Sequence, residues 1–266
     1  VSLGPIWKFS AQDIGFRGGS SVGAMLGAGS LVHLMQAGDT GSVTLSLRGA
    51  GSARTSVFLD GMRLVNPATG VFDLSLIPGF LIQDVEVVHG SNENDPTALG
   101  GSIHLSTGGI EQENRSISLS GGQWGRRSVA SQYETSMRRT RVRAAAQFEA
   151  YSGDYVYQNT VLLDRPKLRR TGADKRSGSA YVHVSRPMKK GDVSLLMLAS
   201  TVERGVPGLS NAAPVEARQE DHFFRIQAKQ SRSIRAGSMN WQVAANSSDL
   251  VFEHPVSGVS QLKVHA

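Results

Sequence analysis

The chain has 266 residues, no cysteine, 30 glycines and a net charge of +6. The lack of cysteine excludes disulfides and thiolate metal sites. No run of about 18 apolar residues occurs, which excludes a transmembrane helix and leaves a soluble protein or a barrel of alternating strands.

The first 110 residues predict short strands, glycine turns and one short helix. Val22 to Met35 has helical spacing, but Gly27 and Gly29 interrupt it, so the helix is expected to be short. Apolar or alternating runs predict strands over 43–47, 55–59, 62–64, 85–88 and 102–106. Asp60-Gly61 lies between two of these runs and predicts a tight hairpin, because both residues tolerate positive φ.

Residues 111–266 predict a series of amphipathic strands with a period of two. In one of them Val142, Ala144, Ala146 and Phe148 share a face, and Arg141, Arg143, Gln147 and Glu149 share the other. Similar alternation predicts strands over 115–122, 126–135, 139–151, 176–186, 191–203, 219–231 and 238–248, with an eighth starting near 257.

The joins between these strands alternate between short and long. Those near 121–125, 138–139 and 189–191 are short, whereas 152–175 and 204–218 are long and polar. Short turns at one end and long loops at the other are typical of an outer-membrane barrel. A soluble β-sandwich would alternate as well, so that alternative stays open.

Neither nucleic-acid binding nor catalysis is favoured. Residues 1–110 carry 5 Lys and Arg against 8 Asp and Glu, and residues 111–266 carry 23 against 14. The basic residues of the second part alternate with apolar ones, as on the wet face of a sheet. Gly19-Ser20-Ser21-Val22-Gly23 matches a hydrolase nucleophile elbow but follows no convincing strand. The seven histidines lack the spacing of a metal site, so we expect no bound metal, and no motif calls for an enzyme or a cofactor.

Four stretches of the first part carry a recognisable pattern in a fixed order. They are Leu45-Ser46-Leu47-Arg48-Gly49, the hairpin 57–64 around Asp60-Gly61, the segment 73–87 with Ile77-Pro78 and Val85-Glu86-Val87, and Ala98-Leu99-Gly100-Gly101-Ser102-Ile103. Together they resemble the plug domain of TonB-dependent outer-membrane receptors. The segments 73–90 and 100–105, with the short stretches 153–159 and 215–219, are most similar to the vitamin B12 (cobalamin) receptor branch.

This resemblance implies an α+β plug domain at 1–110, followed at 111–266 by the antiparallel up-and-down strands that begin a transmembrane β-barrel. Barrels of this family have about 22 strands, so seven or eight cannot close around a plug. We therefore expect a longer gene, a truncated chain or a second chain that completes the wall. An export signal and a TonB box are expected upstream of Val1 and Trp7.

The implied function is active uptake of a large scarce nutrient across the outer membrane, with cobalamin or a related chelate as ligand. The implied partners are the TonB–ExbB–ExbD complex and outer-membrane lipid. An iron-siderophore receptor and a non-transporting soluble β-module are the alternatives. The low aromatic content, 6%, fits the aromatic girdles of a barrel poorly, which keeps the soluble module in view.

The resemblance also carries two sets of site residues. Ligand contacts would come from plug loops, at Ser42, Thr44, Gly51, Asn66, Thr69 and Gly70. Plug–barrel contacts would come from Arg48, Glu86 and His89, and Asp60 would serve the turn. The pattern departs from the family at His89-Gly90-Ser91, where Arg-Gly-Pro is usual, and at Asp95-Pro96. Because histidine is fully charged only in acid, plug anchoring is expected to be weaker or pH-sensitive.

Overall fold

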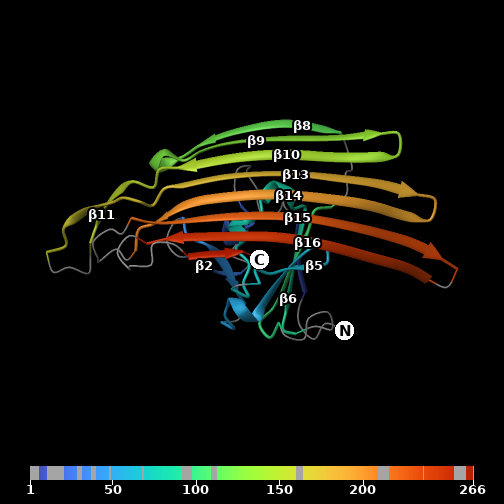
Figure 1. Ribbon diagram of the computed structural model, residues 1–266, viewed down its shortest axis with the longest axis horizontal. Helices are drawn as coiled ribbons and strands as arrows, with labels where there is room; N and C mark the ends of the chain where they lie inside the picture. Colours follow the sequence, from blue (N-terminus) through green and yellow to red (C-terminus); the bar gives the residue numbers. More distant parts are fainter. Residues whose placement is uncertain are drawn as a thin grey trace.

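A computed structural model describes most of the chain. The described residues are 6–10, 21–28, 32–36, 40–47, 49–67, 69–91, 98–108, 113–159, 164–208, 216–235, 237–254 and 262–265. They form two parts, an N-terminal unit (6–108) and a curved sheet that we call the wall (114–265), as Figure 1 shows. No helix in these ranges is long and apolar enough to cross a membrane.

A mixed five-stranded sheet organises the N-terminal unit. Its order is β1 (Ile6–Ser10), β6 (Asp84–His89), β7 (Gly101–Ser106), β4 (Thr55–Leu59) and β5 (Met62–Leu64). Only β4 and β7 run parallel. The predicted strands and the Asp60-Gly61 hairpin are confirmed, and both turn residues have positive φ, 48° and 84°. The strand β1 was not predicted.

The other elements of the unit cover this sheet. They are α1 (Val22–Ala28), a hairpin of β2 (His33–Gln36) and β3 (Val43–Ser46), and the 3-10 turns η1 (Ser52–Arg54), η2 (Leu74–Leu76) and η3 (Gly79–Leu81). The predicted helix is short, as expected, and its second half forms β2. Apolar side chains of these elements and of the sheet fill one core that includes Leu26, Leu45, Leu59, Ile103 and Leu105.

The wall is an antiparallel sheet of eight strands in the order β17-β16-β15-β14-β13-β10-β9-β8. The bounds are β8 (Asn114–Gly121), β9 (Arg127–Met137), β10 (Thr140–Tyr151), β13 (Lys175–Met188), β14 (Gly191–Val206), β15 (Ala217–Ile234), β16 (Gly237–Glu253) and β17 (Leu262–His265). The seven strands predicted with bounds are confirmed; the eighth was expected to start near 257, which lies outside the described residues, and β17 begins at Leu262. Among the described residues the sheet does not close, so β8 and β17 are its edges.

The two ends of the wall differ, although not entirely as predicted. The turns β9–β10, β13–β14 and β15–β16 lie at the short-turn end, on the right in Figure 1. The joins 152–174 and 207–216 lie at the opposite, long-loop end. The short join 122–126, with η4 (Gln123–Gly125), also lies there, because successive strands alternate in direction. The first long loop holds an unpredicted hairpin of β11 (Tyr155–Gln158) and β12 (Lys167–Arg170).

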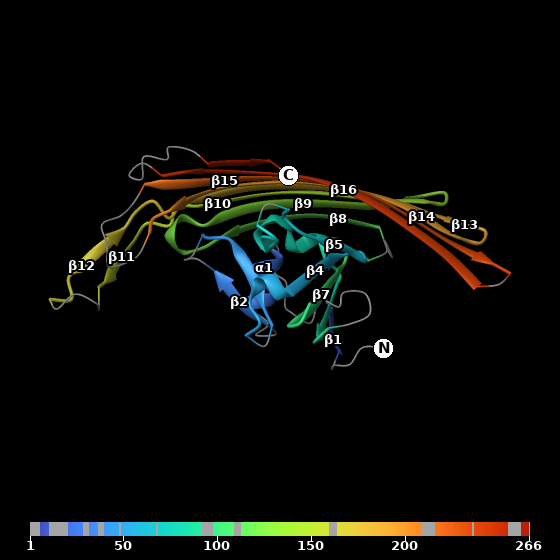
Figure 2. The same cartoon turned by 60° about the horizontal axis from the view of Figure 1, so that its bottom comes forward.

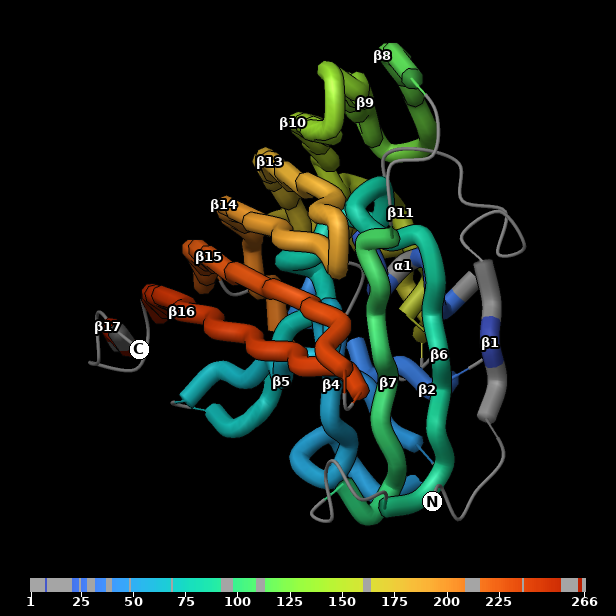
Figure 3. The backbone as a smooth tube through the Cα atoms, turned by 90° about the vertical axis from the view of Figure 1, so that its right-hand side faces the viewer, coloured from blue at the N-terminus to red at the C-terminus, as the bar shows by residue number. Residues whose placement is uncertain are grey.

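The two faces of the wall have opposite character. The side chains on the convex face stay uncovered by any second sheet of the described residues, and Phe148 in the predicted apolar row is 50% exposed. The concave face covers the N-terminal unit, as the views in Figures 2 and 3 agree. The exposed apolar side chains of the convex face are Ile117, Leu119, Val129, Tyr133, Met137, Phe148, Val182, Leu195, Met197, Phe224, Trp241 and Val243.

Candidate functional site at the plug-wall boundary

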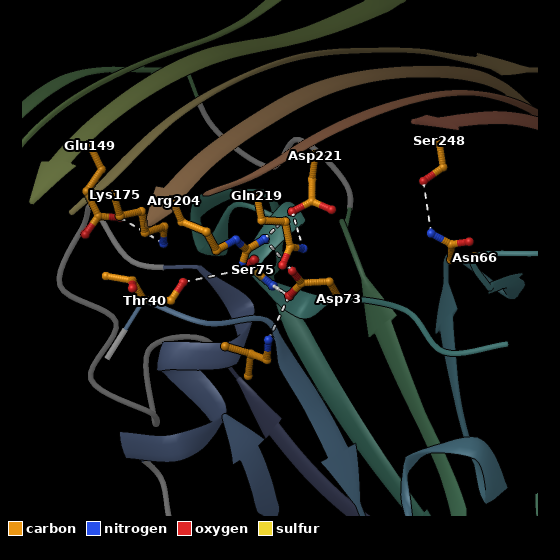
Figure 4. Close-up of polar contacts among 11 residues, drawn as sticks. Thr40, Asn66, Asp73, Ser75, Glu149, Lys175, Arg204, Gln219, Asp221 and Ser248 are labelled. Carbon is orange, nitrogen blue, oxygen red and sulfur yellow. Dashed lines mark hydrogen bonds and ion pairs between the residues drawn. The ribbon is translucent and has the colours of Figure 1, made fainter. Parts of the chain in front are cut away.

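Arg204 at the end of β14 is the strongest link between the wall and the N-terminal unit. Its guanidinium is fully buried and lies 2.7 Å from an oxygen of Asp73 in the N-terminal unit and 2.6 Å from an oxygen of Asp221 on β15 (Figure 4). It also donates to the carbonyl of Thr40, at 3.3 Å. One wall cation therefore binds two loops of the N-terminal unit, and two carboxylates balance its charge.

Asp73 extends this contact into the N-terminal unit. Its second oxygen accepts the backbone N–H of Val43 at 2.8 Å and that of Ser75 at 2.9 Å. The first bond holds the start of β3 and the second caps η2. A shift of Arg204 that moves Asp73 would therefore also affect β3 and η2.

Arg143 makes a second link, nearer the short-turn end. It donates to the carbonyl of Thr107 at 2.8 Å and is ion-paired with Glu134 on β9. Thr107 in turn donates its backbone N–H and its hydroxyl to the carboxylate of Asp60, at 2.9 and 2.8 Å. Asp60 therefore has a role beyond the predicted turn, because it joins the β4–β5 hairpin to the segment after β7.

Arg225 is the third wall arginine that faces the N-terminal unit. It is fully buried and donates to Gln227 and Asn246, and Gln227 donates to the carbonyl of Asp60 at 3.4 Å. Aromatic pairs supplement these polar contacts. Phe72 meets Phe223 edge to face at 5.0 Å between ring centroids, and Phe80 stacks on Tyr181 at 5.6 Å.

The residues predicted to bind ligand lie in several loops. Ser42 and Thr44 are half-buried, and the Thr44 hydroxyl donates to Met35 across the β2–β3 hairpin. Gly51 has a φ of 77° with open space where a Cβ would stand. Thr69 and Gly70 are exposed in the loop 65–72. Asn66, in the same loop, donates to Ser248 of the wall at 3.4 Å. Ligand binding by these six residues stays a prediction.

Of the predicted plug–barrel residues, Glu86 and His89 do not take part in the contacts described above. Arg48 is outside the described residues, and so is Asp95-Pro96. Glu86 lies 3.3 Å from Lys8 of β1, within the N-terminal unit. His89 is half-buried at the end of β6. Its role in the plug–barrel contact, and that of Glu86, stay predictions. The cations of the boundary contacts described above, Arg143 and Arg204, stand on the wall, not on the N-terminal unit.

His104 occupies the sheet face on which Glu86 lies. Its ring stacks on Phe58 with 4.7 Å between centroids, and Nε2 lies 2.9 Å from the hydroxyl of Ser102. Burial lowers the pKa of His104 below its ordinary value, and the nearby charge of Glu86 opposes this shift. The described residues hold no group of three or more His, Asp or Glu side chains that could bind a metal.

Comparison with known proteins finds a family match in the first part of the chain. A model of the TonB-dependent receptor plug domain matches residues 2–102. The "Vitamin B12 transporter BtuB" of Vibrio vulnificus is 35% identical over 79 residues, which are 29% of this chain and 13% of that protein.

Solved structures share the whole arrangement. "Copper transporter OprC" has a TM-score of 0.73 at 14% identity. The match covers 94% of this chain and 38% of the OprC chain. The ferric-catecholate import receptor Fiu of K12 E. coli has a TM-score of 0.70 at 15% identity. The match covers 99% of this chain and 41% of the Fiu chain. The chain thus spans less than half the length of these relatives. At such identities the likeness shows the fold, an α+β plug beside antiparallel barrel strands, which confirms the predicted fold class.

Proposed function

We propose that the protein serves as an outer-membrane receptor that imports a large scarce nutrient when the TonB–ExbB–ExbD complex rearranges the plug, because residues 2–102 match the TonB-dependent receptor plug domain. The observation that carries this proposal is the division of the wall into two faces. The convex face offers apolar side chains to lipid, and the concave face binds the plug through Arg143, Arg204 and Gln227. Polar contacts of this kind can be broken and remade without unfolding the wall.

The ligand we propose is a metal chelate. The cobalamin transporter similarity and the stretches 73–90 and 100–105 support cobalamin or a related chelate. The structural likeness to a ferric-catecholate receptor supports an iron siderophore as the second candidate. Ser42, Thr44, Gly51, Asn66, Thr69 and Gly70 are the proposed plug contacts for either ligand.

Uptake in whole cells tests the proposal. Cells that lack their own receptors and produce this protein from its complete gene are given radiolabelled cyanocobalamin or a ferric siderophore, with and without TonB. We expect uptake of one ligand that depends on TonB, and a protein that only detergent extracts from membranes. Extraction without detergent, together with no TonB-dependent uptake of either ligand, would favour the soluble β-module.

A further inference from the structure

We propose that the short-turn end of the wall binds the phosphate groups of anionic phospholipids. This inference rests on the proposed function, because a receptor barrel turns its short-turn end toward the periplasm and the phospholipid leaflet of the outer membrane. The surface consists of cations in the three short turns and at the convex strand ends beside them. We call these seven residues the basic rim: Arg138, Arg139, Arg186, Lys189, Lys190, Arg232 and Arg235.

The positive charge of the second part of the chain is concentrated at this end. Residues 111–266 carry 23 Lys and Arg against 14 Asp and Glu. The segments 137–141, 186–192 and 229–235 hold nine of these cations and a single acid, Asp192, which leaves 14 cations against 13 acids elsewhere. The three turns lie together at one end of the sheet (Figure 1). This end of the wall therefore attracts anions, whereas the rest is close to neutral.

The two faces of the wall separate the acid from the basic rim. Asp192 lies on the concave face with Arg141 and Lys229, where the three line a cavity of about 380 Å³ beside Asp60 of the plug. The seven side chains of the basic rim are exposed. Among the described residues, no carboxylate is ion-paired with any of them. The outward surface of the short-turn end is thus purely cationic.

Arg186 and Arg232 lie on the convex face, at the limit of its apolar residues. Arg186 is opposite Val193 of β14. Val193 is opposite Gln230, which accepts the Nε1–H of Trp241 at 2.6 Å. Arg186 and Trp241 therefore share one row across four strands, and tryptophan is typical of the girdle where the apolar band meets the lipid headgroups. Arg232 lies two residues nearer the turn, about 7 Å further along the strand, at headgroup level.

Exposed apolar side chains stand among these cations. Met188 and Met239 lie in the row of Arg232, and Ile234 and Met137 lie nearer the turns, the last 69% exposed. Long basic side chains beside apolar ones are suited to a membrane interface, because the apolar groups enter the acyl chains while the charges extend to the phosphates. An acidic protein would match the charges alone. The mixture continues the convex apolar face, so we assign the surface to lipid.

The test is a titration of the protein, made from its complete gene and purified in detergent, followed by native mass spectrometry. The probes are dioctanoyl-phosphatidylglycerol and dioctanoyl-phosphatidylcholine, which have the same chains and a phosphate each but differ in net charge. A basic residue near an anionic surface contributes about fivefold to affinity, so we expect a preference for phosphatidylglycerol of at least about tenfold. The preference should fall between about 0.1 and 1 M ammonium acetate, because salt screens exposed charges. Equal binding of the two lipids would overturn the proposal.

Two pairs of substitutions locate the surface. Arg186→Gln with Arg232→Gln should lower the preference at least about fivefold. Arg127→Gln with Arg176→Gln is the matched control, because both arginines are exposed on the convex face at the long-loop end, where Glu203 lies opposite Arg176. The control pair should leave the preference unchanged. Each variant must keep the heat-modifiable gel mobility of the parent. Equal effects of the two pairs would contradict a site at the short-turn end.

Failure of this inference is distinguishable from failure of the proposed function. TonB-dependent uptake by a protein that binds both lipids equally would overturn the lipid surface and leave the receptor function standing. A preference that the Arg186 and Arg232 substitutions remove, in a protein without TonB-dependent uptake, would support the surface and contradict transport. Equal binding of the lipids together with tight binding of polyglutamate would assign the basic rim to an acidic protein and overturn the proposal.

Discussion

Arg204 is the residue on which attachment of the plug depends most, because it is fully buried between Asp73 and Asp221. Replacing it with alanine leaves the buried carboxylate of Asp221 and the half-buried carboxylate of Asp73 without their cation. We expect Arg204→Ala to lower the free energy of unfolding by about 3–5 kcal/mol, the effect of breaking a buried ion pair. Urea unfolding of the purified protein in micelles measures this value.

The matched control for this prediction is Arg169→Ala. Arg169 pairs with Asp154 at 3.3 Å, but its side chain is 67% exposed, so water already solvates the charge. The expected loss is under about 1 kcal/mol. Similar losses in the two variants would show that Arg204 contributes no more than a surface charge.

His104 predicts a pH dependence of plug stability. Its pKa is lowered in the folded plug, mainly by burial, so the unfolded chain takes up the proton first as pH falls. The contribution of neutral His104 is fully present above its ordinary value of 6.5 and is lost as pH falls below it toward the folded pKa. We expect the thermal midpoint of the protein to be lower at pH 5 than at pH 7.5.

A matched variant isolates this effect. His104→Gln keeps a donor toward Ser102 but does not titrate. Its midpoint should change less between the two pH values than that of the parent protein. An equal change in both proteins would assign the pH dependence to other groups.

At this scale the sequence predicted little of the plug–wall contact. Asp73 and Arg204 are 131 positions apart, and no local pattern connects them. Arg204 was placed in a long polar loop, whereas β14 runs on to Val206. In β14 the apolar residues that alternate with polar ones end at Ala199. The backbone nevertheless stays paired with β15 as far as Val206, which lies opposite Ala217. The role of Asp60 in the hairpin was predicted because a tight turn depends only on neighbouring residues.

At the scale of elements, the convex faces of the wall strands carry the membrane proposal. In β14 the outward residues Val193, Leu195, Met197 and Ala199 are apolar, and Thr201 begins the polar end. Four alternating residues cover about 20 Å at 3.3 Å per residue. This length approaches the apolar band of about 25 Å that an outer-membrane barrel presents to lipid.

A charge placed within this band tests the proposal. Met197 is 40% exposed on the convex face, and we expect Met197→Arg to destabilise the membrane-inserted protein by about 2–4 kcal/mol. Thr201→Arg is the control, because Thr201 is exposed on the same face of β14 at the polar end of the strand, where the expected effect is about 0–1 kcal/mol. Urea unfolding in lipid vesicles measures both. A tolerated arginine at 197 would contradict lipid contact at that position.

The sequence predicted the wall strands well and the accessory strands poorly. Period-two alternation identified seven of the eight wall strands, because each has one apolar face. The hairpin of β11 and β12 escaped notice, since its exposed face mixes Val156 with Gln158, Lys167 and Arg169. β2 was missed because its residues continue the helical spacing of α1 beyond the glycines.

At the scale of the whole molecule, the proposed transport requires the plug to move against the wall. The chain has no cysteine, so the pair Asn66→Cys and Ser248→Cys can be introduced where the native side chains lie 3.4 Å apart. Oxidation of the pair to a disulfide should stop uptake by cells, and reduction should restore it. Uptake that continues after quantitative oxidation would show that this part of the plug stays in place during transport.

The guanidinium groups of the boundary stand on the wall, and the plug supplies the acceptors, the Asp73 carboxylate and the carbonyls of Thr40 and Thr107. Carbonyls are present in any plug, but the carboxylate must be at one position. A plug transplanted from a receptor without an acid there would leave Arg204 with Asp221 alone. The two domains are therefore not interchangeable parts, and hybrid receptors built on this wall should work only when the donor plug carries that acid or receives it by mutation.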